Sequence, residues 1–82
     1  MIVNAVKCPK CGEIIYSRSH HDFHYCHCGN CYIDGGFEYT RIGAKEDLDK
    51  MKVFPFEVNA TKEELLLDWD KRKDKFGWAK EE

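Results

Sequence analysis

The sequence lacks any apolar run near the roughly 18 residues that a membrane-spanning helix requires. Residues 1–7 also lack the basic start and the long apolar segment of a secretory signal, and no low-complexity stretch occurs. With 43% hydrophobic and 13% aromatic residues, the composition is that of a globular chain. We therefore expect a small cytoplasmic protein that makes no membrane contact.

The sequence also has no excess of positive charge. Its 13 Lys and Arg residues stand against 15 Asp and Glu residues, which gives a net charge of −2. Residues 1–43 carry four of each sign, and residues 44–82 carry nine basic and eleven acidic side chains. Non-specific nucleic-acid binding depends on a field of Lys and Arg, so neither half favours it. The sequence shows neither a phosphate-binding loop nor a nucleophile beside a base, which weighs against an enzyme.

Cysteine is absent from the last 51 residues of the 82, because all five cysteines lie within the first 31. An odd number fits disulfide pairing poorly, and closely spaced cysteines in a cytosolic protein are more often metal ligands. The two groups are Cys8-Pro9-Lys10-Cys11-Gly12 and Cys26-His27-Cys28-Gly29-Asn30-Cys31. In a Cys-x-x-Cys-Gly turn, backbone amides face the sulfurs and glycine permits the left-handed backbone that closes the turn.

The second pair of ligands is open to two readings. Cys26 and Cys28 stand before a glycine, whereas Cys28 and Cys31 have the commoner spacing. We favour four ligands, which are Cys8, Cys11, Cys26 and Cys28. Cys31 is kept as an alternative ligand. A neighbouring histidine could also replace a cysteine, and the candidates are His20, His21, His24 and His27. Four thiolates in tetrahedral geometry favour one structural Zn²⁺, with iron as the main competitor.

The segments around the cysteines are rich in β-forming residues. Strands are predicted at 2–6, 13–17, 23–25 and 31–34; Gly35-Gly36 indicates a tight turn, and residues 37–42 are predicted to return as a strand. This pattern predicts a small α+β fold that begins with a zinc ribbon. The ribbon would have rubredoxin-like knuckles and short antiparallel strands.

The second half is predicted to be mainly helical. Residues 53–58 are apolar and extended, and Pro55 excludes them from a central strand. Thr61 and Glu64 match a capping box, so we predict a C-terminal helix from Thr61 to Phe76 that stops at Gly77. Residues 79–82 are expected to fray. The predicted organisation is a zinc ribbon at 1–43 and a helical extension at 44–82 packed on it.

Further motif residues lie among the cysteines: Ser17-Arg18, His21-Asp22-Phe23, Asp34-Gly35-Gly36, Tyr39 and Arg41. Together with the knuckles they make residues 3–43 resemble a family of small, mostly phage-encoded zinc-ribbon proteins of unknown function. That family has Cys-x-Cys-Gly in its second knuckle, which supports Cys26 and Cys28, and Cys31 departs from its pattern. The resemblance implies a phage or prophage source and supplies no activity.

The motif residues other than cysteine form the candidate functional surface: His21, Asp22, Asp34, Tyr39 and Arg41. A histidine beside two carboxylates could serve acid–base chemistry or hold a second metal. The same carboxylates could simply cap a loop and shape a hairpin, and we favour this structural role.

Three functions are compatible with these features. We favour a non-enzymatic, zinc-stabilised, phage-type accessory protein that binds a host or phage protein in the host cytoplasm. One alternative is a zinc-ribbon nucleic-acid-binding module linked to transcription, using Arg18, Arg41 and the aromatic strands. The other is a small hydrolytic enzyme that uses His21, Asp22 and Asp34. Neither the partner nor the oligomeric state follows from the sequence.

Overall fold

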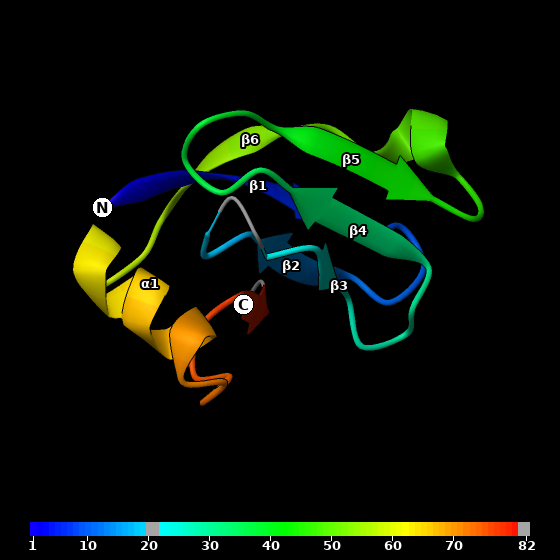
Figure 1. Ribbon diagram of the computed structural model, residues 1–82. Coiled ribbons are helices and arrows are strands. Elements are labelled where there is room, and N and C mark those ends of the chain that lie inside the picture. The colour runs from blue at the N-terminus through cyan, green and yellow to red at the C-terminus, as the bar shows by residue number, and fades with distance from the viewer. Residues whose placement is uncertain (20–21, 81–82) are drawn as a thin grey trace.

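Two antiparallel sheets face each other in the computed structural model, which describes residues 1–19 and 22–80 (Figure 1). The strand order is β6-β1-β2-β7 in the first sheet and β3-β4-β5 in the second. The helical elements are α1 (Lys62–Asp70) and η1 (Leu48–Lys50), a single 3-10 turn. The strands are β1 (Ile2–Lys7), β2 (Glu13–Tyr16), β3 (His24–Tyr25), β4 (Cys31–Asp34), β5 (Arg41–Ala44), β6 (Phe54–Glu57) and β7 (Trp78–Lys80).

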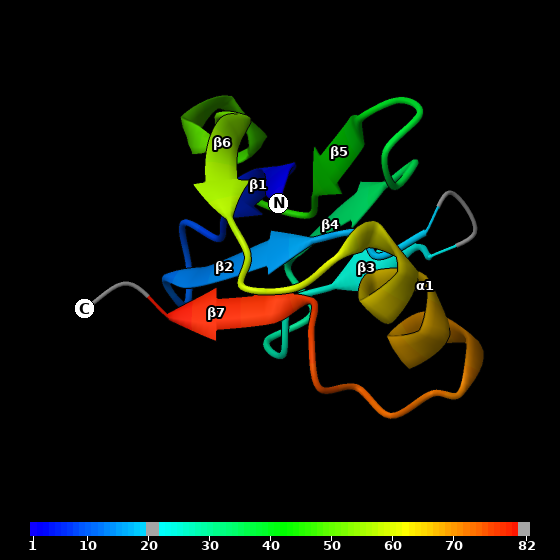
Figure 2. The ribbon, with the colours of Figure 1, turned by 90° about the vertical axis from the view of Figure 1, so that its left-hand side faces the viewer.

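The first sheet is assembled from both ends of the chain. β1 pairs with β2 through the first cysteine turn, and β6 pairs with the other side of β1. Pro55 therefore lies in an edge strand, where its missing N–H costs no ladder bond, and this agrees with the prediction for that segment. β7 closes the opposite edge against β2 (Figure 2).

Alternation along the strands divides the apolar side chains between two core layers. Val6, Ile15 and Ile33 meet between the sheets in a cluster that also holds three of the cysteines. Val3, Ala5, Ile14 and Tyr16 point to the outer face of the first sheet, where Val58 and Leu65 cover them. Leu65 comes from α1, so the helix covers part of the sheet face opposite to the one that the second sheet covers.

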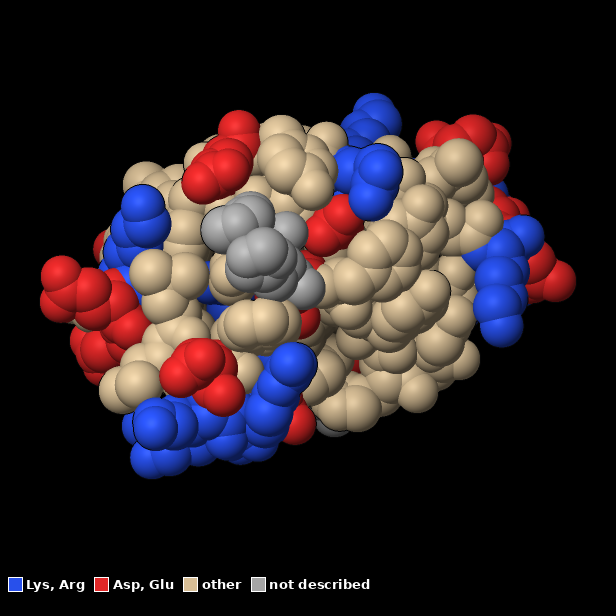
Figure 3. Space-filling view, in the orientation of Figure 1, with Lys and Arg blue, Asp and Glu red and all other residues tan. Residues whose placement is uncertain are grey.

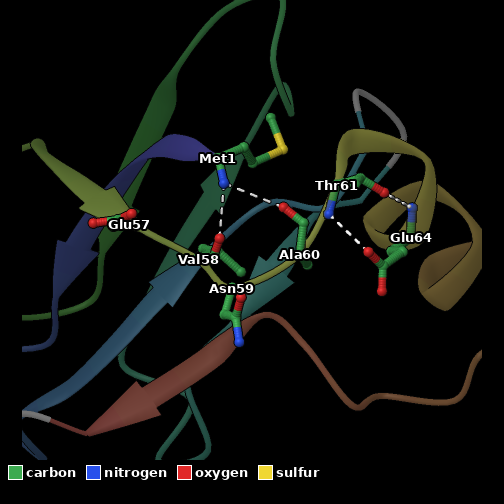
Figure 4. A pocket seen from close by; sticks show the side chains of 7 residues that line it. All are labelled: Met1, Glu57, Val58, Asn59, Ala60, Thr61 and Glu64. Atoms are coloured by element: carbon green, nitrogen blue, oxygen red, sulfur yellow. Dashed lines mark hydrogen bonds between the residues drawn. The ribbon is translucent and has the colours of Figure 1, made fainter.

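The start of α1 is fixed as the sequence predicts. Thr61 Oγ1 accepts from the Glu64 amide at 3.1 Å, and a Glu64 carboxylate oxygen accepts from the Thr61 amide at 3.1 Å (Figure 4). Both bonds satisfy amides that the first turn of a helix leaves without partners. The amino group of Met1 donates to the carbonyl oxygens of Val58 and Ala60, which ties this linker to the beginning of β1.

The end of the helix differs from the prediction, because α1 stops at Asp70 and does not run to Phe76. The Asp68 carboxylate accepts hydrogen bonds from the amides of Lys75 and Phe76, so the chain folds back around this side chain. Arg72 and Asp74 adopt left-handed backbone conformations, with φ of 54° and 53°, which no helix interior contains. A buried carboxylate thus directs the chain away from the helix axis.

Two further segments differ from the expectations. The return strand begins at Arg41 and not at residue 37, because Gly35 and Gly36 both have positive φ and the Gly35 carbonyl accepts from Glu38 and Tyr39 in a longer turn. Residues 79 and 80 do not fray, since they pair with β2 as part of β7. The second half is therefore not only helical, because it supplies both edge strands of the first sheet.

Candidate metal centre

Each cysteine turn is closed by a glycine amide, which lies four residues after the first cysteine in one turn and three residues after it in the other. In the first, the Gly12 amide donates to the Cys8 carbonyl at 2.9 Å; in the second, the Gly29 amide donates to the Cys26 carbonyl at 2.9 Å. Both glycines have a φ of 76°, a conformation that glycine adopts at little cost. Each turn therefore presents its two cysteines on one side, and the facing sheets bring the two turns together.

The four sulfur atoms that the two turns supply lie within 4.8 Å of one another. The Cys8 and Cys28 sulfurs are 3.5 Å apart, and those of Cys26 and Cys28 are 3.2 Å apart. Sulfurs about 2.3 Å from one tetrahedral ion would be about 3.8 Å apart, so the cluster is close to the size that a metal ion needs. The chemistry of the donor set, four thiols and no oxygen, fits zinc or iron and fits no hard cation.

Two thiols of the cluster, those of Cys8 and Cys26, have lowered pKa values. Burial disfavours the Cys8 thiolate, but hydrogen bonds from the amides of Cys11 and Lys10 outweigh it and lower the pKa to about 6. Cys26 is also buried, and the amide of Cys31 overcomes that burial and lowers its pKa. The lowered pKa values of Cys8 and Cys26 favour metal binding at neutral pH, because the thiolate is the form that coordinates. Burial raises the pKa of Cys11, and at Cys28 the hydrogen bond from the Asn30 amide is outweighed by the neighbouring sulfurs, which raise the pKa, so a bound cation would have to hold these two thiols in their charged form.

The fifth cysteine lies outside this group of four. Cys31 begins β4, is fully buried and packs in the core layer between the sheets. Burial, together with hydrogen bonds to the sulfurs of Cys26 and Cys8, raises the pKa of its thiol. Cys31 therefore stays protonated behind the cluster and contributes packing there.

The described histidines also lie outside the group of four. His24 is buried, its Nδ1 is 3.1 Å from Asp22 Oδ2, and its ring packs 4.1 Å from the Trp78 ring. His27 has its Nδ1 at 2.7 Å from Glu13 Oε2 and stacks on Trp78 with ring centroids 4.7 Å apart. A Cβ at position 77 would come within 2.5 Å of His24 Nε2, so Gly77 is required for this packing. His20 and His21 lie outside the described residues.

Asp22, Asp34 and Arg41 of the candidate functional surface form ion pairs that hold loops in place. The partner of Asp22 is Arg18. Arg18 is 3% exposed, and its guanidinium contacts Asp22 at 2.9 Å, Asp68 at 2.8 Å and Asp74 at 3.1 Å. Burial opposes the charge on Asp22, but the hydrogen bonds from His24 and Arg18 lower its pKa to about 2. The same arginine lowers the pKa of Asp68 against its burial. Asp34, which is also buried, pairs with the exposed Arg41 at 2.7 Å.

Both carboxylates that the hydrolytic alternative would use are held in ion pairs. Each carboxylate has its own arginine, Arg18 for Asp22 and Arg41 for Asp34, and His21 lies outside the described residues. Tyr39 is half exposed and lies in the turn after Gly35. Sequence reasoning missed Asp68, Asp74 and His24 as partners in this network. No local signal could have found the first two, since they lie 50 and 56 residues away from Arg18.

Residues 1–44 match the family model of a domain of unknown function, DUF7695. That match covers more than half of the 82 residues. The chain belongs to the DUF7695 family. No curated protein and no solved structure matched the chain. The DUF7695 segment contains the four clustered cysteines, Arg18 and Asp22, whereas Asp68 and Asp74 come from the part of the chain that follows it.

The DUF7695 segment also carries an exposed group of aromatic rings, which we call the aromatic surface and define as Phe23, Tyr25 and Tyr32. Phe23 and Tyr32 stack with ring centroids 4.4 Å apart, and Tyr25 lies 5.3 Å and 5.7 Å from the two. The Tyr32 ring covers Gly43 on the neighbouring strand, where any Cβ would come within 2.4 Å of it. Figure 3 shows a broad area without charged side chains over β3 and β4, with charged groups at its margin.

No helix among residues 1–19 and 22–80 is long and apolar enough to cross a membrane. This finding agrees with the expectation of no membrane span. The cytoplasmic location stays a prediction.

Proposed function

We propose that this protein is a non-enzymatic, zinc-stabilised binding protein that recognises a protein partner through its aromatic surface. The observation that carries the proposal is the exposure of two rings, because Phe23 is 42% and Tyr25 is 49% exposed. Tyr and Phe are large, rigid side chains that are enriched at the centres of protein interfaces. An aromatic surface built on paired strands can bind a partner with little loss of side-chain entropy.

The chemistry of the cysteine cluster supports a structural role for the metal. Four thiolates favour zinc, and four protein ligands around one ion leave no position for a substrate. The cluster joins the two turns that lead into β2 and β4, so the ion would hold together the sheets that carry the aromatic surface. A domain of this size gains much of its stability from such a staple.

The buried ion network supports a binding protein over the two other functions. Asp22 and Asp34 are engaged by arginines, which leaves them poorly suited to act as an acid or a base. Arg18 is buried and so is not placed to contact a phosphate backbone. The resemblance to phage-encoded zinc ribbons suggests the biological context of the proposal. In that context the protein is an accessory protein that binds a host or phage protein in the host cytoplasm.

The proposal is tested by comparing captured proteins on immobilised, zinc-loaded wild-type protein and on the double variant Phe23→Ala/Tyr25→Ala. Truncating two central interface rings costs about 2 kcal/mol or more, so a genuine partner should bind at least about 30-fold more weakly to the variant. The matched control is Leu67→Ala, because Leu67 is 53% exposed on α1 and lies outside the aromatic surface.

A partner retained by wild type and by the Leu67 variant but lost by the double variant supports the proposal. A set of captured proteins that is the same for all three chains contradicts it. Fluorescence anisotropy with labelled single-stranded oligonucleotides at low salt tests the competing function. Saturable binding that the double variant loses would assign the surface to nucleic-acid bases instead.

A further inference from the structure

The outer face of the first sheet is covered at one end only. α1 lies near the start of β1, whereas η1 and the end of β1 lie at the other end of the molecule (Figure 1). The uncovered end contains a hollow of about 440 Å³. Its lining consists of Lys7, Ile14, Lys50, Lys52, Phe54 and Phe56.

The strand register explains the apolar floor of this hollow. Ile14 stands opposite Lys7, and Phe54 stands opposite Ala5, so all four side chains share the outer face. Phe54 and Phe56 are half-buried and meet edge to face, with centroids 6.3 Å apart and planes at 90°. A flat apolar group could therefore pack against a fixed phenylalanine ring.

The rim of the hollow is basic in a chain that carries a net charge of −2. Among the described residues that line it, three are lysines and none is acidic; the Lys50 ammonium lies 3.7 Å from a carboxylate oxygen of Asp47, which does not line the hollow. Lys52 is exposed and lies between η1 and β6. A lysine ammonium on a flexible stem is a common partner for phosphate, since it acts as a mobile point charge.

We propose that this hollow binds a nucleoside phosphate, with the base against Phe54 and the phosphate between the lysines. The charge of the rim is complementary to a phosphate, and the apolar floor is complementary to a base, which stacks on aromatic rings. The volume lies in the range of single small-ligand sites and is too small for an extended chain. The ligand is either a free mononucleotide or the phosphorylated end of a nucleic-acid strand. The hollow lies on the first sheet and the aromatic surface on the second, so the two proposals are independent.

The test is a titration of the zinc-loaded protein with AMP, followed by the backbone amide signals in nuclear magnetic resonance spectra. AMP should shift the signals of residues 7, 14, 54 and 56 with a dissociation constant below about 1 mM. Adenosine and ribose 5-phosphate, which each carry half of the ligand, should bind about tenfold more weakly or worse. No saturable change up to about 5 mM AMP overturns the proposal.

Two variants separate the roles of charge and ring. Lys52→Glu should weaken AMP binding about tenfold or more by reversing one rim charge, and Phe54→Leu should weaken it by a similar factor through lost stacking. Lys45→Glu is the matched control, because Lys45 is also exposed but follows β5 in the second sheet. Equal AMP binding by all four chains overturns the proposal.

Two further ligands show whether the bound phosphate belongs to a free nucleotide, a nucleic-acid strand or neither. Tighter binding of a 5′-phosphorylated oligoadenylate at the same residues supports the proposal and assigns a strand end. Equal or weaker binding of that oligonucleotide supports a free nucleotide. An acidic, tyrosine-containing peptide that shifts the same signals at lower concentration than AMP overturns the nucleotide assignment.

Discussion

Gly12 and Gly29 show how much a single residue determines in this chain. Each glycine follows the second cysteine of a turn, and each has a φ of 76° that a residue with a Cβ adopts only under strain. The glycine after Cys28, absent after Cys31, is therefore the feature that separates the two possible ligand pairs. The structure places Cys28 in the four-sulfur group and Cys31 in the apolar core.

The ligand assignment predicts different outcomes for two serine variants. Cys26→Ser should lower the bound zinc and unfold the sheets, because three thiolates hold the ion more weakly than four. Cys31→Ser should keep about one zinc per chain while losing about 1–3 kcal/mol of stability, since it buries a hydroxyl in an apolar layer. Elemental analysis of the purified variants and urea unfolding measure the two effects. Equal zinc loss in both variants would refute the assignment.

At the scale of elements, a buried ion pair between Arg18 and Asp68 joins an early loop to the end of α1. Arg18 bonds both the carboxylate of its own loop, on Asp22, and the carboxylate of α1, on Asp68. Asp68 in turn accepts from the amides that follow the helix and so starts the path toward β7. A helix pattern read from the sequence extended to Phe76 because the apolar spacing continues there. The carboxylate that turns the chain belongs to Asp68, and the arginine that pairs with it lies 50 residues earlier.

Removing this arginine should uncouple α1 from the loop. Arg18→Met leaves the carboxylates of Asp22 and Asp68 buried without a counter-charge, which costs about 3–5 kcal/mol. Urea unfolding of the zinc-loaded protein at neutral pH measures the loss. Lys10→Met is the control, because the Lys10–Glu46 pair is exposed to solvent, where an ion pair adds little to stability. A loss for Arg18→Met no larger than the control's would show that the network contributes little.

At the scale of the whole molecule, the two halves of the chain share one sheet. β6 and β7 come from the second half and form the edges of the sheet whose centre is β1 and β2. The radius of gyration is 11.5 Å, close to the roughly 12 Å expected of one compact domain of this length. The DUF7695 segment, residues 1–44, supplies neither edge strand. Whether the predicted ribbon at 1–43 can fold without the predicted extension at 44–82 is therefore open to experiment.

Truncation answers that question. A chain of residues 1–44 should fail to fold cooperatively even with zinc, because it exposes both edges of β1–β2 and loses the cover that Val58 and Leu65 provide. The dispersion of its amide signals with one equivalent of zinc, compared with the full chain, is the measurement. A dispersed spectrum with one bound ion would instead show that residues 1–44, which contain the predicted ribbon, fold independently.

The sequence by itself determined the features that depend on neighbours in the chain: the two cysteine turns, the strands beside them, the edge position of Pro55 and the capping box at Thr61. Each rests on backbone conformations and hydrogen bonds that span a few residues. Only the tertiary structure decided which carboxylates surround Arg18, where α1 ends, and that both ends of the chain join one sheet. Those features depend on contacts between residues tens of positions apart, and no local pattern encodes which distant partner will satisfy a buried charge or an open strand edge.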